Sequence, residues 1–182
     1  SVKLLAVRLY AFRDDRFDAV IDGAVYGAIA GLGFATIENA LYIVQNTEMV
    51  TGTLRAINEG SSIAAVRALA GPGHVIYSAF AGYYLGLAKF NPDDAGPIVL
   101  KGLVIAAVIH AGYNSLSGIA IGVLSAVYGL NQFVAFIAFV VVYDGIFILL
   151  LLRKLDAYRQ AYKRAQRSEE PQSEPGVPDF ES

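Results

Sequence analysis

The stretch "FVAFIAFVVVYDGIFILLLL", residues 133–152, decides the fold class of this chain. Asp144 is its only charged residue in twenty positions. A helix that spans a membrane needs about 20 mostly apolar residues, and this stretch has that length. Its β-branched and aromatic residues would also suit a strand, but strands are rarely longer than about 10 residues. We therefore predict a lipid-facing transmembrane helix.

Three more stretches have the length and apolar content of a span: residues 18–45, 62–88 and 98–126, with the fourth at 131–152. Residues 2–12 are apolar but too short, and they are interpreted as the end of a span that begins before Ser1. Only 16% of the 182 residues are charged, against about 25% in ordinary soluble domains. The predicted fold is an all-α, polytopic transmembrane helix bundle of about four full spans plus the end of one truncated span, over residues 1–152.

Basic residues indicate how the bundle is oriented. They gather on alternate connections between the predicted spans and after the last one. Because basic residues are enriched on the cytosolic side, we predict a multi-pass protein of the cell membrane with its C-terminus in the cytosol. Residues 153–167 are predicted to form a basic cytosolic helix extension, and residues 168–182 a disordered acidic tail. The bilayer is an expected partner; nucleic acid is not.

A few polar residues lie inside the predicted spans, among them Glu38 and the two histidines of the chain, His74 and His110. At 1.5 Å per residue, Glu38 lies about 10 Å from one surface, and each histidine lies about 18 Å from a surface. Ionisable groups cost about 2.5–3.5 kcal/mol each in a bilayer, so they usually face the bundle interior and mark function. We expect the three side chains to meet in one cavity in the outer half of the membrane.

Local spacing adds neighbours to these residues. His110 and Asn114 are four residues apart and share a helix face, as do Phe34 and Glu38. Asn39 is turned about 100° from Glu38. Tyr77 and Ser78 place hydroxyls on the face of His74. The run 71–73, Gly-Pro-Gly, predicts a kink or local break in the helix just before His74.

A carboxylate and imidazoles in a wet pocket suit the activation of water. Glu38 would take the proton, and a histidine or asparagine would hydrogen-bond the oxyanion, where one donor is worth about 2.7–4 kcal/mol. Two histidines and a glutamate are also a common ligand set for catalytic zinc, here Glu38, His74 and His110. The residues leave open whether the chemistry uses a metal or only glutamate. The chain has no cysteine, which excludes a disulfide framework, a thiolate metal site and a cysteine nucleophile.

Three segments together carry a resemblance: "DGAVYGAIAGLGFATIENALYI" (22–43), "RALAGPGHVIYSAFAGYYLGLA" (67–88) and "GLVIAAVIHAGYNSL" (102–116). They resemble the PrsW family of intramembrane proteases, distant relatives of the CAAX prenyl proteases and the Abi proteins. The resemblance runs from about Lys3 to Ser115, with the motifs in family order. The family pattern Phe-x-x-x-Glu-Asn matches Phe34, Glu38 and Asn39; a His after a Pro/Gly turn matches His74; His-x-x-x-Asn matches His110 and Asn114.

The resemblance implies an intramembrane endopeptidase that cleaves membrane-embedded or membrane-anchored proteins, such as an anti-sigma-factor-like regulator. By resemblance, Glu38 binds the water or metal, His74 and His110 act as ligands or oxyanion donors, and Asn114 orients or donates. The sequence departs from the first family motif, Glu-Glu-x-x-Lys. The lysine of that motif matches Lys3, so its two glutamates are expected immediately before Ser1. The chain would then lack the carboxylate that the family uses as its principal catalytic base, so residues 1–182 are expected to be inactive on their own.

Two alternatives from other classes remain open. One is a transporter or proton-coupled channel lined by Glu38, His74 and His110, since intramembrane acids and histidines also relay protons; the lack of an evident inverted repeat counts against it. The other is a non-catalytic membrane scaffold. Asp144 matches no motif, and we expect it to pair with a tyrosine or a backbone group inside the bundle.

Overall fold

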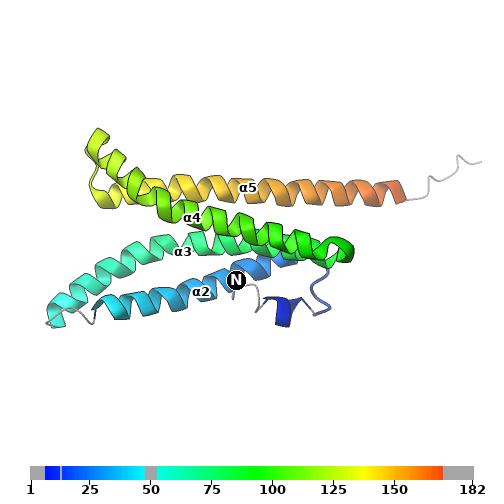
Figure 1. The fold of residues 1–182 in the computed structure, drawn as a ribbon, viewed down its shortest axis with the longest axis horizontal. Helices are drawn as coiled ribbons and strands as arrows, with labels where there is room; N and C mark the ends of the chain where they lie inside the picture. Colours follow the sequence, from blue (N-terminus) through cyan, green and yellow to red (C-terminus); the bar gives the residue numbers. More distant parts are fainter. Residues whose placement is uncertain (1–6, 13, 48–52, 170–182) are drawn as a thin grey trace, which may run out of the picture.

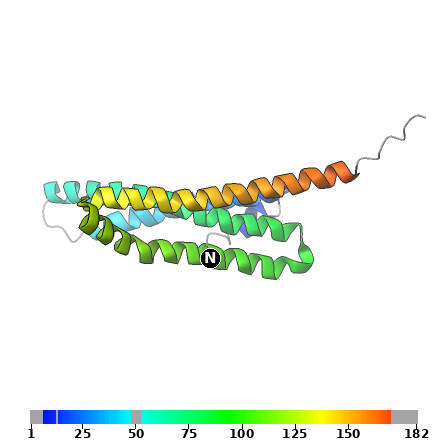
Figure 2. The ribbon, with the colours of Figure 1, turned by 90° about the horizontal axis from the view of Figure 1, so that it is seen from above.

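The computed structural model describes residues 7–12, 14–47 and 53–169, and every regular element in them is helical. A five-residue π-helical turn, η1 (Val7–Ala11), precedes α2 (Val20–Thr47), α3 (Thr53–Lys89), a short 3-10 turn η2 (Pro92–Asp94), α4 (Ala95–Tyr128) and α5 (Gln132–Glu169). The four long helices run up and down as neighbours along one axis (Figures 1 and 2). The predicted all-α membrane bundle is confirmed.

Three helical segments are long and apolar enough to cross a membrane among the described residues: Val20–Gln45, Pro92–Tyr128 and Gln132–Ser168. They contain most of the predicted spans 18–45, 98–126 and 131–152. Helix α3 covers the predicted span 62–88 but is not one of the three. Its second half is the most enclosed part of the bundle, with residues 76–86 all buried. Because neighbouring helices rather than lipid cover this half, α3 can carry polar groups such as His74 and Ser78.

Of the predicted kink or local break before His74, the break is wrong and the kink stays a prediction. Helix α3 is continuous from Thr53 to Lys89, with Pro72 inside it. A proline removes one backbone donor from a helix, but packing by neighbouring helices can hold the helix together. The predicted end of a truncated span is described only from residue 7, where Val7 is buried in a single π-helical turn.

Glycines bring α2 and α3 into backbone contact. A Cβ added to Gly23 would lie 2.8 Å from Gly86 N, and one added to Gly27 would lie 3.0 Å from the Cα of Gly82. A Cβ on Gly31 would lie 2.5 Å from the carbonyl oxygen of His74. Small residues at every fourth position allow membrane helices to approach this closely. These glycines therefore pack α2 against α3, whereas a Cβ added to Gly118 or Gly122 on α4 would have nothing within 4 Å.

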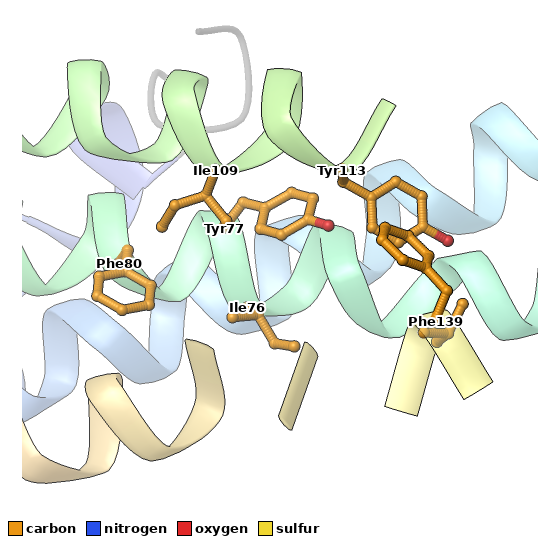
Figure 3. Close-up of a cluster of buried hydrophobic side chains, with 7 residues drawn as sticks. Ile76, Tyr77, Phe80, Ile109, Tyr113 and Phe139 are labelled. Atoms are coloured by element: carbon orange, nitrogen blue, oxygen red, sulfur yellow. The ribbon is translucent and has the colours of Figure 1, made fainter. Parts of the chain in front are cut away.

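Helices α3, α4 and α5 meet through large side chains instead. Their shared core, shown in Figure 3, is made mainly of rings and branched aliphatic groups: Ile76, Tyr77, Phe80, Ile109, Tyr113, Phe139 and Val140. The rings of Tyr113 and Phe139 lie 5.3 Å apart. The hydroxyl of Tyr143 donates a hydrogen bond of 2.7 Å to the carbonyl oxygen of Ile109. This core holds α4 and α5 against the half of α3 that carries His74.

One end of the bundle gathers the start of α2, the end of α3 and the start of α4. There the ammonium of Lys89 donates to the carbonyl oxygen of Phe17 at 2.7 Å. Asp22, in the first turn of α2, accepts hydrogen bonds from the backbone N–H groups of Asp18 and Ala19 just before the helix, as a capping-box carboxylate does. Helix α5 extends past this end (Figure 1), and its last part contains the predicted extension 153–167 as unbroken helix. Of the predicted tail, residues 170–182 lie outside the described residues.

Candidate active site

The glycine contacts set an antiparallel register that brings Glu38 to His74. Residue 23 lies opposite 86, and 27 opposite 82. The same register places Ala35 opposite His74, and Ala35 is only 2% exposed. Glu38 follows on the next turn of α2, and its Oε2 lies 3.5 Å from Nε2 of His74. A backbone contact two turns away therefore positions the carboxylate beside the imidazole.

His110 joins this pair from α4. Its ring lies 5.1 Å from the ring of His74, edge to face. Tyr77, one turn after His74 on α3, stacks on His110 with ring centroids 5.3 Å apart and planes at 26°. The side chain of His74 is 8% exposed and that of Glu38 is 39% exposed. The site is thus closed on the α3 side and open on the α2 side.

The other predicted residues differ in their distance from this cluster. The ring of Phe34 lies 6.1 Å from that of His74. Asn39 Nδ2 lies 3.9 Å from the point that a Cβ on Gly71 would occupy, so it faces the turn before His74. Asn114 lies one turn beyond His110 on α4, and its side chain is exposed. Lys3 lies outside the described residues.

Two side chains belong to the neighbourhood of the site although sequence reasoning assigned them little or no role. Tyr77 is 5% exposed and contacts both histidine rings. Asp144 on α5 is also 5% exposed and lies near Tyr77. The signal for Asp144 was present, since it is the lone charge of an apolar span. Its neighbour could not be found from sequence, because that depends on how α5 packs on α3.

The residue types of this cluster would suit a metal ion, but their arrangement in the structure does not. Two imidazoles and a carboxylate are ordinary zinc ligands. Within the residues that the structure describes, no three His, Asp or Glu side chains are grouped so that they could hold a metal ion. Glu38 and His74 approach through their polar atoms, whereas His110 meets His74 as a ring. We therefore derive no chemical step through a metal.

A cavity of about 620 Å³ adjoins the site between α2, α3 and α5. Its lining is almost entirely apolar and includes Leu32, Ala35, Asn39, Pro72, Ile76 and Ile148. Asn39 follows Glu38, and Pro72 lies two residues before His74, but Glu38, His74 and His110 do not themselves line the cavity. It offers space for an apolar segment next to polar groups.

Fold and site together define an all-α membrane protein with a carboxylate–imidazole cluster inside its helix bundle. The model of the family described as "PrsW family intramembrane metalloprotease" matches residues 1–146. The chain belongs to this family, as the motifs around Glu38, His74 and His110 indicated.

Similar proteins with an assigned name support the same family. The chain is 38% identical over 115 residues to a protein named "Protease PrsW" from Geobacillus kaustophilus, covering 63% of this chain and 46% of that one. It is 34% identical over 116 residues to the protein of the same name from Bacillus subtilis, covering 63% and 47%. For that from Shouchella clausii the identity is 29% over 114 residues, covering 63% and 47%. The matches span about half the length of these relatives, and no solved structure matches significantly.

Proposed function

We propose that this chain forms the membrane-embedded part of an intramembrane endopeptidase that hydrolyses peptide bonds of membrane-embedded or membrane-anchored proteins. The observation that carries the proposal is the 3.5 Å approach of Glu38 Oε2 to His74 Nε2 inside the bundle, with the ring of His110 beside them. Membership of the family supports a protease over the transporter and the scaffold.

In this mechanism Glu38 acts as a base, though not as the only group that activates the water. Its carboxylate is 39% exposed on the open side, where a water molecule can reach it. The water oxygen attacks the carbonyl carbon of the substrate while its proton passes to Glu38, which returns it to the leaving amine. His74 holds the carboxylate in place from the closed side. His110 donates to the oxyanion from α4, and Asn114, one turn away, is the second proposed donor.

The proposed substrate is a membrane protein. The apolar cavity of about 620 Å³ supports this, because it can accept the apolar side chains of a transmembrane segment beside Asn39. The family resemblance makes an anti-sigma-factor-like regulator the first substrate to test.

We also propose that the end of the bundle with Lys89 and the basic part of α5 faces the cytosol. Because the chain has no cysteine, Ser168→Cys and Asn131→Cys each introduce a single thiol at opposite ends. An impermeant maleimide added to intact cells should label only the Asn131→Cys protein; labelling of only the other would reverse the orientation.

The whole protein, including any segment encoded before Ser1, should be assayed with a membrane-anchored reporter. We expect His74→Ala and Glu38→Gln to lower the cleavage rate at least about 100-fold, as for the loss of a group that acts in the transition state. Tyr128→Phe, an exposed ring at the far end of α4, is the control and should cleave normally. Undiminished cleavage by both His74→Ala and His110→Ala would defeat the assignment.

The alternative to this glutamate mechanism is a zinc ion held by Glu38, His74 and His110, the ligand set that the residue types suggest. Metal analysis of the same purified proteins tests it separately from cleavage. Zinc bound to the unmodified protein and lost in both histidine variants supports this ligand set. An active protein without zinc contradicts it and supports the glutamate mechanism.

A further inference from the structure

Asp144 is a buried carboxyl group that the proposed mechanism does not use. Both of its oxygens are buried, and neither has a hydrogen-bond partner in the part of the chain that the structure describes. The same holds for the hydroxyl of Tyr77. Each buried polar group left without a partner costs about 1–3 kcal/mol, and more when it is charged. A hydrogen bond between Asp144 and Tyr77 would therefore remove this cost for both groups.

The packing of α5 on α3 places the turns that carry these two groups side by side. The two helices run parallel, and the rings of Phe80 and Phe147 are in contact at 6.4 Å. Tyr77 precedes Phe80 by three residues, and Asp144 precedes Phe147 by three. They lie on the same pair of facing turns, and the carboxyl group of Asp144 interacts electrostatically with Tyr77. A hydrogen bond between them would satisfy both groups.

The orientation of Tyr77 matters because its ring supports both histidines. The ring stacks on His110 at 5.3 Å and lies 6.3 Å from His74. Its hydroxyl lies over the backbone of Gly73, 2.6 Å from the position that a Cβ there would take. Figure 3 shows this ring lying along α3 with its hydroxyl toward Tyr113. A group that holds the hydroxyl therefore also fixes the face that the ring presents to His110.

We propose that Asp144 is a positioning residue, which holds the hydroxyl of Tyr77 and thereby keeps the Tyr77 ring against His110. The catalytic consequence rests on the proposed function, since His110 is there an oxyanion donor. The geometric part of the inference, that Asp144 fixes the position of the Tyr77 ring, does not depend on the proposed function. A donor misplaced by a fraction of an ångström is costly, because oxyanion stabilisation depends on preorganised geometry.

The geometric part can be tested by NMR on the whole protein in detergent micelles. The chain has two histidines, so 13C-labelled imidazoles give two ring signals from it, assigned with His74→Ala and His110→Ala. A stacked tyrosine shifts the resonances of the ring beneath it. We expect Asp144→Leu and Tyr77→Phe to move the His110 signal in the same direction, and the double variant to move it no further. Asp144→Asn keeps an acceptor oxygen and should leave the signal near its original position.

The reporter assay tests the catalytic part. Asp144→Leu and Tyr77→Phe should each lower kcat about tenfold with little change in KM, and the double variant should lose no more than either alone. Asp144→Asn should keep most of the activity. Tyr83→Phe is the control, since Tyr83 is another buried tyrosine of α3 and packs on Tyr84 outside the site.

The two measurements separate failure of the inference from failure of the proposed function. An unmoved His110 signal in Asp144→Leu overturns the inference; if that variant does not fold, an unmoved signal in Tyr77→Phe overturns it. Additive losses of kcat overturn it as well. Absence of cleavage by the unmodified protein contradicts the proposed function, and the NMR result then decides on the positioning role alone.

Discussion

The α2–α3 interface and the α4–α5 interface are packed in opposite ways, the first through glycines and the second through aromatic rings. In the first, glycines of both helices bring backbones together, with no room for a side chain. In the second, rings such as those of Tyr113, Phe139 and Tyr143 fill the space between the helices. Backbone contact allows one register, whereas ring contacts can adjust by small rotations. The base of the proposed site, Glu38, is held by the interface that cannot adjust.

The largest effect is expected from a side chain added to the glycine interface. In Gly27→Leu the new Cβ would lie 3.0 Å from the Cα of Gly82, where neither backbone can give way. We expect a loss of at least about 3 kcal/mol in the free energy of unfolding, the upper part of the range for overpacking. Cleavage should also be lost, because Glu38 and His74 separate. Thermal denaturation in micelles and the reporter assay measure both.

Gly118→Leu is the matched control for that change. Gly118 is also a glycine of a membrane-spanning helix, but nothing lies within 4 Å of a Cβ added there. Its stability should change by less than about 0.5 kcal/mol. Equal effects of the two substitutions would show that the glycine interface has no special role.

A smaller effect is expected in the ring interface. Tyr143→Phe removes the 2.7 Å hydrogen bond to the carbonyl oxygen of Ile109 but keeps the ring. We expect a loss of about 1 kcal/mol in the free energy of unfolding, the usual contribution of one hydrogen bond. Tyr128→Phe, whose ring is 70% exposed, should change nothing. A loss as large as that in Gly27→Leu would contradict the contrast between the interfaces.

The smallest effect is expected outside both interfaces, in the turn before α2. The Arg16 guanidinium hydrogen-bonds Asp14 at 2.8 Å and lowers the pKa of that carboxyl to about 2. A lowered pKa means that the pair stabilises the fold above about pH 4, and that this contribution is lost as the pH falls through about 2. NMR titration of Asp14 should show this pKa, and Arg16→Ala should return it toward its ordinary value.

At neutral pH, Asp14→Asn should leave stability unchanged within error. Surface ion pairs contribute little because water screens them and the side chains lose entropy, and the side chain of Arg16 is 84% exposed. A clear loss of stability would indicate a role for this turn that the structure does not show.

The sequence predicted most of the helices because apolar length alone specifies a span. It also predicted that Glu38, His74 and His110 lie together, because each is a costly residue at similar depth. At the Gly-Pro-Gly run before His74 it predicted a kink or a break, and the break is absent because neighbouring helices decide whether a proline breaks a helix. It expected a tyrosine or a backbone group beside Asp144 but could not single out Tyr77, because the offset between α3 and α5 is a property of two helices and not of one pattern.

The length of α5 has a consequence for water. Its 38 residues extend over about 57 Å at 1.5 Å per residue, nearly twice the thickness of the hydrocarbon layer. The first basic pair after its apolar run, Arg153 and Lys154, fixes where the helix leaves that layer. Asp144 then lies nine residues, or about 14 Å, below that surface, close to the midplane. The proposed hydrolysis consumes water, which must first cross about half of the bilayer to reach this depth. The rate of the proposed reaction would therefore depend on how well the bundle is hydrated as well as on its substrate.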